Sequence, residues 1–85
     1  MPGQPNWKFG SNHTAQQWQD RMMQRGWKPD QITEAIQNGQ RFTASNNVNA
    51  ASAATRYVHP TTGRSVVVDD VTMEVIHVEG DGFLY

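Results

Sequence analysis

Apolar residues gather in three short runs within residues 54–78, and the intervals between the runs have the composition of turns. The runs are rich in Val, Thr, Tyr and Ile, and they are separated by residues 59–63 (HPTTG) and residues 69–72 (DDVT). β-branched and aromatic residues favour strands, whereas Pro, Gly and Asp favour the turns between them. We therefore predict a three-stranded antiparallel meander, and we expect the rest of the chain to pack around it.

The middle run differs from its neighbours because Val66, Val67 and Val68 place apolar side chains on both faces of a strand. Such a strand is normally covered on both sides. In the last run, His77 alternates with Val75 and Met73 on one strand face. We expect His77 either to pack against a helix or to point into a cleft.

A helical pattern begins after residues 11–14 (SNHT). Ala15, Trp18 and Met22 recur at helical spacing, residues 12–14 supply capping side chains, and Gly26 follows the last periodic residue. Trp18 and Met22 should face the sheet. Arg21 and Arg25 lie four residues apart, so they share another face of this first helix.

A second helix is predicted to begin at Pro29, with Asp30 beside it in the first turn. Ile32, Ala35 and Ile36 form its apolar stripe. The helix should end at residues 38–39, and we expect Gly39 to adopt the left-handed conformation of a helix C-terminus.

The remaining segments complete an α+β domain that spans residues 1–85, with two N-terminal helices packed on an antiparallel meander sheet of three to five strands. Residues 1–10 are predicted to be an extended lead-in anchored by Trp7 and Phe9. We further expect a short strand at residues 40–43, a mobile surface loop with nothing to bury at residues 44–53, a turn at residues 79–82, and an edge strand or packed tail at residues 83–85.

Composition limits the function classes. The chain has 85 residues and no cysteine, which excludes disulfides and thiolate metal ligands. No apolar run approaches the roughly 20 residues that span a bilayer, so export would depend on something outside this chain.

Residues 1–64 hold seven Lys and Arg against three acids, a net +4, and residues 65–85 hold five acids without Lys or Arg, a net −5. One part can face phosphate and the other a basic partner, or both charges are simply solvated.

Common metal and phosphate motifs are absent. His13, His59 and His77 lie far apart, and the chain contains no HxxxH, no HExxH and no glycine-rich loop that leads into a helix with a lysine. We expect neither a metal nor another cofactor. The paired acids Asp69 and Asp70 stand where a strand meets a turn, and turn capping is their expected role.

The remaining residues suit metal-free cleavage of RNA. The ribose 2′-hydroxyl is then the nucleophile, and the protein supplies a general base, a general acid and donors for the phosphate. His13 can serve as acid or base, or as a capping residue; His59 is expected to be a turn residue. Thr72 either donates to a phosphate oxygen or finishes a turn. Phosphate contacts, each with a solvated side chain as the alternative, are available from Arg21, Arg25, Lys28, Arg56 and Arg64.

The order of several motifs resembles a known family. The motifs are residues 24–27 (QRGW), the helix start PDQI, residues 38–39 (NG), Ala54-Thr55, Tyr57, Gly63, the three valines, Asp70, Thr72 and Glu74-Val75. Over residues 13–78 the chain resembles the E-group colicin nuclease domain that cuts tRNA anticodon loops, and the C-terminal toxin domains of CdiA and Rhs effectors. This resemblance implies the barnase/EndoU/colicin/RelE fold. It also implies metal-independent transesterification that leaves a 2′,3′-cyclic phosphate.

The same resemblance implies a biological setting, that of an antibacterial toxin used in contact-dependent growth inhibition. The chain would be the C-terminal part of a larger secreted or cell-surface effector, delivered into the cytoplasm of a target bacterium and neutralised by a cognate immunity protein. An inhibitor that covers a basic RNA cleft should be acidic, whereas one that docks on residues 65–85 should be basic.

Residue by residue, Arg25 falls on the functional arginine of the family. Gln17 stands where the colicin has its catalytic lysine, so we expect His13, one helical turn earlier, to replace it as acid or base. Arg56 should bind the phosphate, with Thr72 or His77 completing one cleft. Expected RNA contacts are Arg21, Trp27, Lys28, Tyr57 and Arg64. A ribosome-dependent mRNA interferase and a non-catalytic RNA- or protein-binding module are the alternatives.

Overall fold

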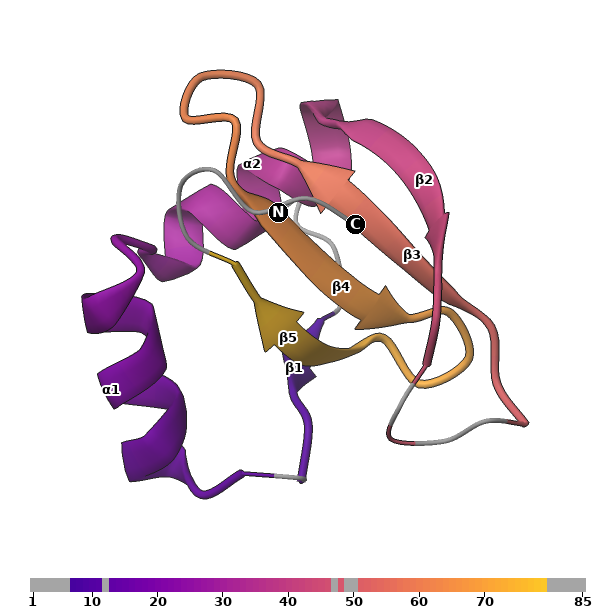
Figure 1. Cartoon of the computed structure of the whole chain (residues 1–85), viewed down its shortest axis with the longest axis horizontal. Helices are drawn as coiled ribbons and strands as arrows, with labels where there is room; N and C mark the ends of the chain where they lie inside the picture. The colour runs from indigo at the N-terminus through magenta and orange to yellow at the C-terminus, as the bar shows by residue number, and fades with distance from the viewer. Residues whose placement is uncertain (1–6, 12, 47, 49–50, 80–85) are drawn as a thin grey trace, which may run out of the picture.

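The computed structural model describes residues 7–11, 13–46, 48 and 51–79. They form two helices and one five-stranded sheet, which confirms the α+β class. In chain order the elements are β1 (Lys8–Phe9), α1 (Ala15–Gln24), α2 (Pro29–Asn38), β2 (Gln40–Ala44), β3 (Ala54–Val58), β4 (Ser65–Asp69) and β5 (Glu74–Val78) (Figure 1). The helices follow a strand and do not open the chain, because the described end of the lead-in joins the sheet.

The sheet has the order β1-β5-β4-β3-β2. The predicted meander is confirmed as β3, β4 and β5, and the predicted short strand at residues 40–43 is confirmed as β2, one residue longer. Strand β1 lies parallel to β5, with Lys8 opposite Glu74 and Phe9 opposite Val75. The sheet is therefore mixed and not wholly antiparallel. A two-residue strand has too few positions for a recognisable alternation.

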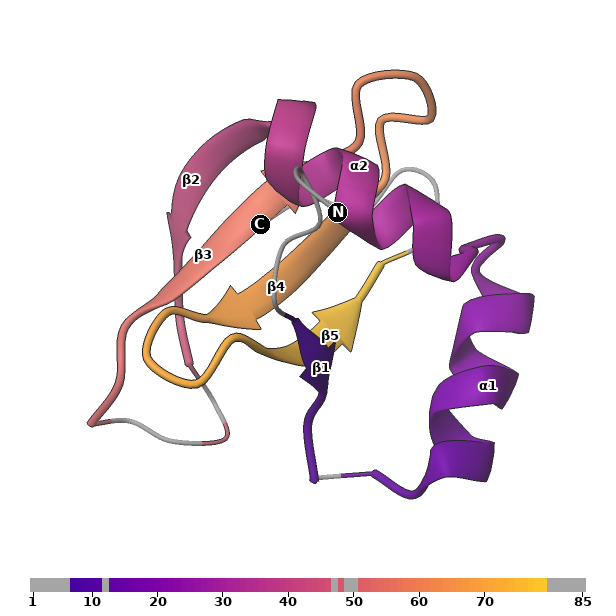
Figure 2. The same cartoon turned by 180° about the vertical axis from the view of Figure 1, so that it is seen from behind.

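Strand β4 is the centre of the core, as its valines predict. Val66, Val67 and Val68 are 0%, 3% and 1% exposed. Helix α2 crosses one face of the sheet, and α1 lies on the β5 side (Figure 2). The helix-side core contains, from the helices and their link, Trp18, Met22, Trp27, Ile32, Ala35 and Ile36, and from the strands Tyr57, Val66, Val68, Val75 and Val78. Trp7 and Phe9 pack against this cluster, so the described end of the lead-in is anchored as predicted.

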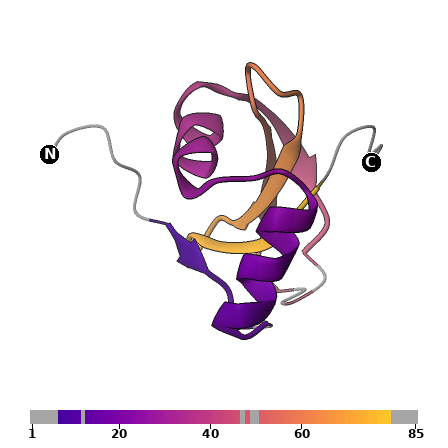
Figure 3. The same cartoon turned by 90° about the vertical axis from the view of Figure 1, so that its left-hand side faces the viewer.

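The opposite face of the sheet carries a smaller apolar cluster of Ala54, Val67 and Ile76. Neither α1 nor α2 covers this face, which is turned toward the viewer in Figure 1 and away from α2 in Figure 3. We call it the helix-free face. Arg56 of β3 and His77 of β5 lie on this face, in one row with Val67.

A β-bulge in β5 decides which residues reach the helix-free face. Val66 pairs with Val78 and Val67 with His77, but Val68 pairs with Val75, so Ile76 is an extra residue. A bulge interrupts the alternation of side chains along a strand. Our expectation that His77 shares a face with Val75 is therefore wrong: Val75 lies in the helix-side core, and His77 lies opposite Val67 on the helix-free face.

The helix termini follow local capping chemistry. Thr14 is the N-cap of α1, its hydroxyl accepts the amide of Gln17 at 3.2 Å, and the Gln17 side chain accepts the amide of Thr14 at 2.9 Å. This reciprocal arrangement is a capping box. Gly26 follows the helix with φ +72°, as expected for a residue that ends a helix. Pro29 is the first residue of α2.

The prediction of a left-handed Gly39 is wrong. Gly39 has φ −79° and ψ 165°, which is extended backbone that leads directly into β2. Its lack of a side chain is needed for another reason. A Cβ at this position would lie 2.2 Å from the carbonyl oxygen of Val58 and 2.5 Å from that of Ala35. Glycine is required here by the close approach of two backbone segments.

Each tryptophan donates its indole N–H to a different part of the fold. Trp7 donates to the Thr33 hydroxyl at 2.9 Å, and Trp18 donates to the carbonyl oxygen of Gly10 at 2.8 Å. Trp27 donates to the carbonyl oxygen of Glu79 at 2.7 Å. Because a buried N–H without a partner destabilises the fold, these bonds fix where each ring can pack.

Asp69 ties the loop before β3 to the turn after β4. Its carboxylate accepts the amides of Val71 and Thr72 and the side-chain donors of Asn46 and Ser52. The turn-capping role expected of Asp69 is confirmed. The expectation that residues 44–53 have nothing to bury needs correction, because two of their described side chains bind a buried carboxylate.

His59 is a turn residue, as predicted. Its ring is 3% exposed, and Nδ1 accepts the amides of Thr61 and Thr62 at 3.1 Å each. Nε2 therefore carries the ring proton and donates it to Glu34 Oε1 at 2.6 Å. This contact joins the β3–β4 turn to α2.

Four expectations lie outside the described residues: the start of the lead-in at residues 1–6, the capping role of Asn12, the turn at residues 80–82, and the strand or tail at residues 83–85. Neither described helix is long and apolar enough to cross a membrane.

We predict that Gly39→Ala and Gly39→Asn both lower the free energy of unfolding by about 1–3 kcal/mol, because any Cβ meets two carbonyl oxygens. Gly63 is the control, since it has φ +75° and no atom within 4 Å of an added Cβ. Asn tolerates left-handed backbone better than Ala does, so Asn should be the better substitute at Gly63 only. Chemical denaturation measures both pairs. A Gly39→Asn variant more stable than Gly39→Ala would favour left-handed backbone at Gly39.

We predict that Asp69→Asn lowers the free energy of unfolding by about 1–3 kcal/mol at neutral pH, because buried donors lose an ionised acceptor. Burial alone raises the pKa of Asp69, but the hydrogen bonds from Thr72, Val71, Asn46 and Ser52 together bring it below 3.8. The stabilisation is therefore present above about pH 4 and is lost as the pH falls through the folded-state pKa. The difference between wild type and variant should shrink on acidification.

The matched control for this prediction is Asp70→Asn, which changes the neighbouring exposed carboxylate, whose side chain accepts the Thr55 hydroxyl at 2.7 Å. Denaturation curves from acidic to neutral pH compare the two variants. An Asp69→Asn deficit no larger than that of Asp70→Asn would contradict the role of Asp69.

Candidate functional site

His77 is the centre of the candidate site. It lies on the helix-free face in one row with Val67 and Arg56, since Arg56 pairs with Val67 across β3 and β4 and Val67 pairs with His77 across β4 and β5. Two strand spacings put the backbones of Arg56 and His77 roughly 10 Å apart. The His77 side chain is 39% exposed. Its imidazole is thus part packed and part open to solvent.

Helix α1 brings three further basic side chains toward His77. Because β1 pairs only with Glu74 and Val75, the end of β5 is not paired with β1, and Arg25 binds there: its guanidinium donates to the carbonyl oxygen of Val78 at 2.7 Å. Arg21 lies one turn earlier on the same helix. His13 stands just before the N-cap, with its ring edge against Trp18 at 5.0 Å between centroids.

These neighbours change the charge state of His77. Burial is the largest cause that lowers the pKa of His77 below 6.5, followed by the positive charges of Arg25, Arg21 and His13. This shift of the pKa favours the neutral form of the His77 ring. A neutral imidazole surrounded by cations can accept a proton, which is what a general base must do.

Glu79 adds a carboxylate that the sequence analysis missed. Its side chain is 5% exposed, and Oε1 contacts Nε2 of His77. The adjacent anion favours the protonated imidazole and so opposes the effect of the cations. The available signal was the spacing of His77 and Glu79, two positions apart, which puts both side chains on one face of an extended segment.

Arg56 is held on the same face by two contacts. Its guanidinium donates to the Ser65 hydroxyl at 3.0 Å and lies over the Phe42 ring, 4.4 Å from the centroid. Ser65 in turn accepts the amide of Glu79 through its backbone carbonyl. Arg56 is thus fixed beside the segment that carries Glu79, at a place where it can meet an anion that approaches His77.

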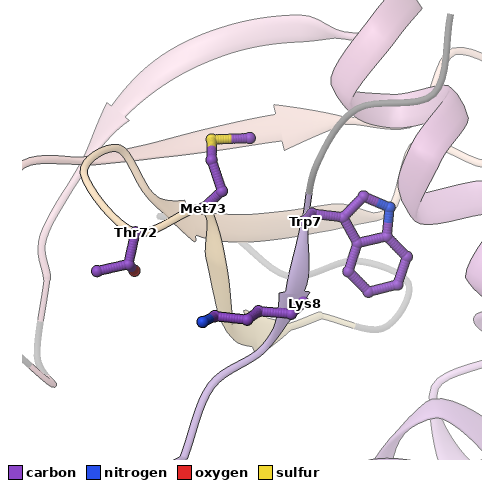
Figure 4. A pocket seen from close by; sticks show the side chains of 4 residues that line it. All are labelled: Trp7, Lys8, Thr72 and Met73. Atoms are coloured by element: carbon purple, nitrogen blue, oxygen red, sulfur yellow. The ribbon is translucent and has the colours of Figure 1, made fainter.

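Thr72 is not part of this group. It lies in the turn before β5, more than about 10 Å along the strand from His77. Its hydroxyl accepts the amide of Glu74 at 3.2 Å, which is the turn-finishing alternative. With Trp7, Lys8 and Met73 it lines a separate hollow of about 340 Å³ (Figure 4).

Two of the expected RNA contacts are buried in the core, and the structure shows the local contacts of two more. Trp27 and Tyr57 are 4% and 9% exposed and belong to the helix-side core, so they lack the open ring face that base stacking requires. Arg64 donates to the carbonyl oxygen of Gly26 at 2.8 Å. Lys28 is exposed at the N-cap of α2. Of the RNA-contact set, Arg21 is close enough to His77 to lower its pKa.

The group has the parts of an acid–base site for a phosphate ester: one imidazole biased toward the neutral form, a second imidazole at the start of α1, and arginines from α1 and β3. Within residues 7–11, 13–46, 48 and 51–79, no cluster of three or more His, Cys, Asp or Glu side chains could hold a metal ion. Comparison with known protein families, with curated proteins and with solved structures gives no match for this chain.

We predict that Arg25→Gln raises the pKa of His77, because a positive charge that disfavours the imidazolium is removed. In wild type the folded-state pKa of His77 lies below its ordinary value of 6.5, so the unfolded chain takes up this proton first. The free energy of unfolding should therefore decrease as the pH falls from 6.5 toward the folded-state pKa of His77. In Arg25→Gln this decrease should be smaller. NMR titration of the His77 ring proton measures the pKa. Arg41→Gln, on the far strand β2, is the matched control. A His77 pKa that is equal in wild type and Arg25→Gln would contradict the coupling.

Proposed function

We propose that this chain is an antibacterial toxin ribonuclease that cuts tRNA, with the anticodon loop as the expected target, by metal-independent transesterification. The observation that carries the proposal is the binding of Arg25 to the carbonyl oxygen of Val78 at the end of β5, where β1 does not reach, with Arg21 and His13 close enough to lower the pKa of His77 and Arg56 on the same face as His77. The α+β class and the meander of β3, β4 and β5 support the barnase/EndoU/colicin/RelE architecture that the motif order implies, whereas the parallel strand β1 ahead of the helices was not expected from it.

In the proposed reaction, neutral His77 takes the proton of the ribose 2′-hydroxyl. The 2′ oxygen forms a bond to phosphorus, and the bond between phosphorus and the 5′ oxygen breaks. Protonated His13 gives its proton to the departing 5′ oxygen. The products are a 2′,3′-cyclic phosphate and a 5′-hydroxyl, and exchange with solvent restores both histidines.

Arginines stabilise the charge that develops on the phosphate. Arg21 and Arg25 approach from α1, and Arg56 from β3, so the phosphate would lie between the helix end and the helix-free face. Guanidinium groups suit this task because their N–H donors match the geometry of phosphate oxygens. Thr72, Trp27 and Tyr57 have no role in this proposal because of their positions in the turn and in the core.

The distribution of described acids favours an acidic inhibitor. Asp69 is engaged in a turn, and Glu79 is buried beside His77, so the acidic segment at residues 65–79 offers fewer free carboxylates than its composition suggests. The group around His77 is mainly basic. We therefore propose an immunity protein that covers this group with carboxylates and blocks RNA directly.

We predict that the purified chain cleaves total tRNA in excess EDTA and leaves 2′,3′-cyclic phosphate ends. His77→Gln and His13→Gln should each reduce the cleavage rate by roughly 10²–10⁴-fold, because each removes a proton-transfer group. Gel analysis gives the rates, and sequencing of the new 3′ ends gives the tRNA and the cut position. Arg41→Gln, outside the site, should cleave at the wild-type rate.

Other results would redirect the proposal. Intact tRNA under every condition would exclude the tRNase function, and cleavage that is lost with EDTA would exclude the metal-free mechanism. Cleavage that appears only with ribosomes present would favour an mRNA interferase. Toxicity that is unchanged in His13→Ala would favour a non-catalytic binding module.

A further inference from the structure

We propose that Glu79 is a positioning residue that fixes the tautomer of His77. Its carboxylate accepts the proton of Nε2–H, so that the basic lone pair of the ring is on Nδ1. The catalytic consequence, proton abstraction by Nδ1, rests on the proposed ribonuclease function. The pairing of Glu79 with His77 can be tested independently of that function.

Glu79 is held firmly by its backbone. Its amide donates to the carbonyl oxygen of Ser65 at 2.8 Å, and its own carbonyl oxygen accepts the indole N–H of Trp27 at 2.7 Å. These bonds attach the residue after β5 to β4 on one side and to the link between α1 and α2 on the other. The carboxylate is therefore presented to His77 by a fixed part of the fold.

Burial makes the pairing necessary. The Glu79 side chain is 5% exposed and contacts His77 Nε2 through Oε1. A buried ionised carboxylate destabilises the fold unless a donor compensates it. A neutral imidazole that carries its proton on Nε2 is such a donor, and the contact is with that nitrogen.

The charges around His77 come from three parts of the fold. His13, Arg21 and Arg25 approach from α1, Arg56 shares its row from β3, and Glu79 follows β5. Of these described groups, Glu79 is the only acid. Burial and the cations lower the pKa of His77 and so favour the neutral imidazole, and the carboxylate orients the neutral ring.

A base oriented by a third group is a general device for proton transfer, because the orienting acceptor holds the ring in one tautomer and one rotation. At this site the carboxylate occupies Nε2. The lone pair that would take the 2′-hydroxyl proton is then on Nδ1. Glu79 acts only through His77, which distinguishes it from the residues that meet the substrate.

The first test uses wild-type protein alone. ¹⁵N chemical shifts of the His77 ring, recorded above its pKa, identify the protonated nitrogen. We expect Nε2 to carry the proton and Nδ1 to be unprotonated. A ring protonated on Nδ1 would overturn the proposal, whether or not any variant folds.

The second test compares Glu79→Gln with Glu74→Gln, each of which removes one carboxylate along the same part of the chain. The side-chain amide introduced by Glu79→Gln retains an acceptor oxygen but has no charge, so the pKa of His77 should fall further in this variant. Glu74→Gln should leave it close to the wild-type value. NMR titration of both variants decides, and a His77 pKa equal in wild type and Glu79→Gln would overturn the proposal.

The third test measures tRNA cleavage across pH. Glu79→Gln should lower kcat by roughly 10- to 100-fold with little change in KM, because orientation of the base is lost while the phosphate contacts remain. A general base acts in its unprotonated form, so the acidic limb of the rate profile should move to lower pH together with the His77 pKa. A loss expressed in KM alone would overturn the positioning role.

The tests separate the two proposals. If the tautomer and the pKa shift are found but wild type leaves tRNA intact, the Glu79–His77 pairing stands and the ribonuclease proposal fails. If wild type cleaves tRNA and Glu79→Gln leaves both the pKa and the rate unchanged, the ribonuclease proposal stands and the positioning role of Glu79 fails.

Discussion

The extra residue in β5 is the constraint on which the candidate site depends. Strict alternation from Val75 would turn His77 and Glu79 toward the helices and Val78 away from them. With Ile76 inserted, Val78 joins the helix-side core, and His77 and Glu79 face the same side as Arg56. One residue therefore changes the face of three side chains. Bulges frequently occur beside active sites because they re-aim side chains in this way.

The segment at residues 25–27 anchors the end of β5 to the helices. Arg25 donates to the carbonyl oxygen of Val78, Trp27 donates to that of Glu79, and Gly26 supplies the positive φ that reverses the chain between them. Arg25 thus has a structural contact as well as a position near His77. Because Arg25 holds the strand in place and also lowers the pKa of His77, it couples the electrostatics of the candidate site to the stability of its support.

Period and turn chemistry were sufficient to predict the two helices, the meander and the doubly buried β4, because those signals repeat over several residues. They were insufficient where one atom or one residue decides the outcome. The bulge at Ile76 leaves no mark in the sequence EVIHV, and the need for Gly39 arises from a carbonyl oxygen at the far end of β3, a strand that comes later in the chain. Of the expected catalytic residues, Arg25 binds the end of β5 next to His77, His13 influences the pKa of His77 from the other end of α1, and Arg56 shares the face of His77, whereas Thr72 lies in the turn before β5. The sequence shows Glu79 two residues after His77, but it does not show that the carboxylate is buried against the imidazole ring.

The three indole hydrogen bonds give this small domain an internal set of reporters. The indole N–H of Trp18 joins α1 to the segment after β1, and that of Trp7 joins the lead-in to α2. The indole N–H of Trp27 joins the link between the helices to the end of β5. Amide and indole protons exchange with solvent when the surrounding structure opens locally. The Trp27 proton therefore records openings that separate the end of β5 from the link between the helices, and the Trp18 proton records openings that release α1, the helix that carries Arg21.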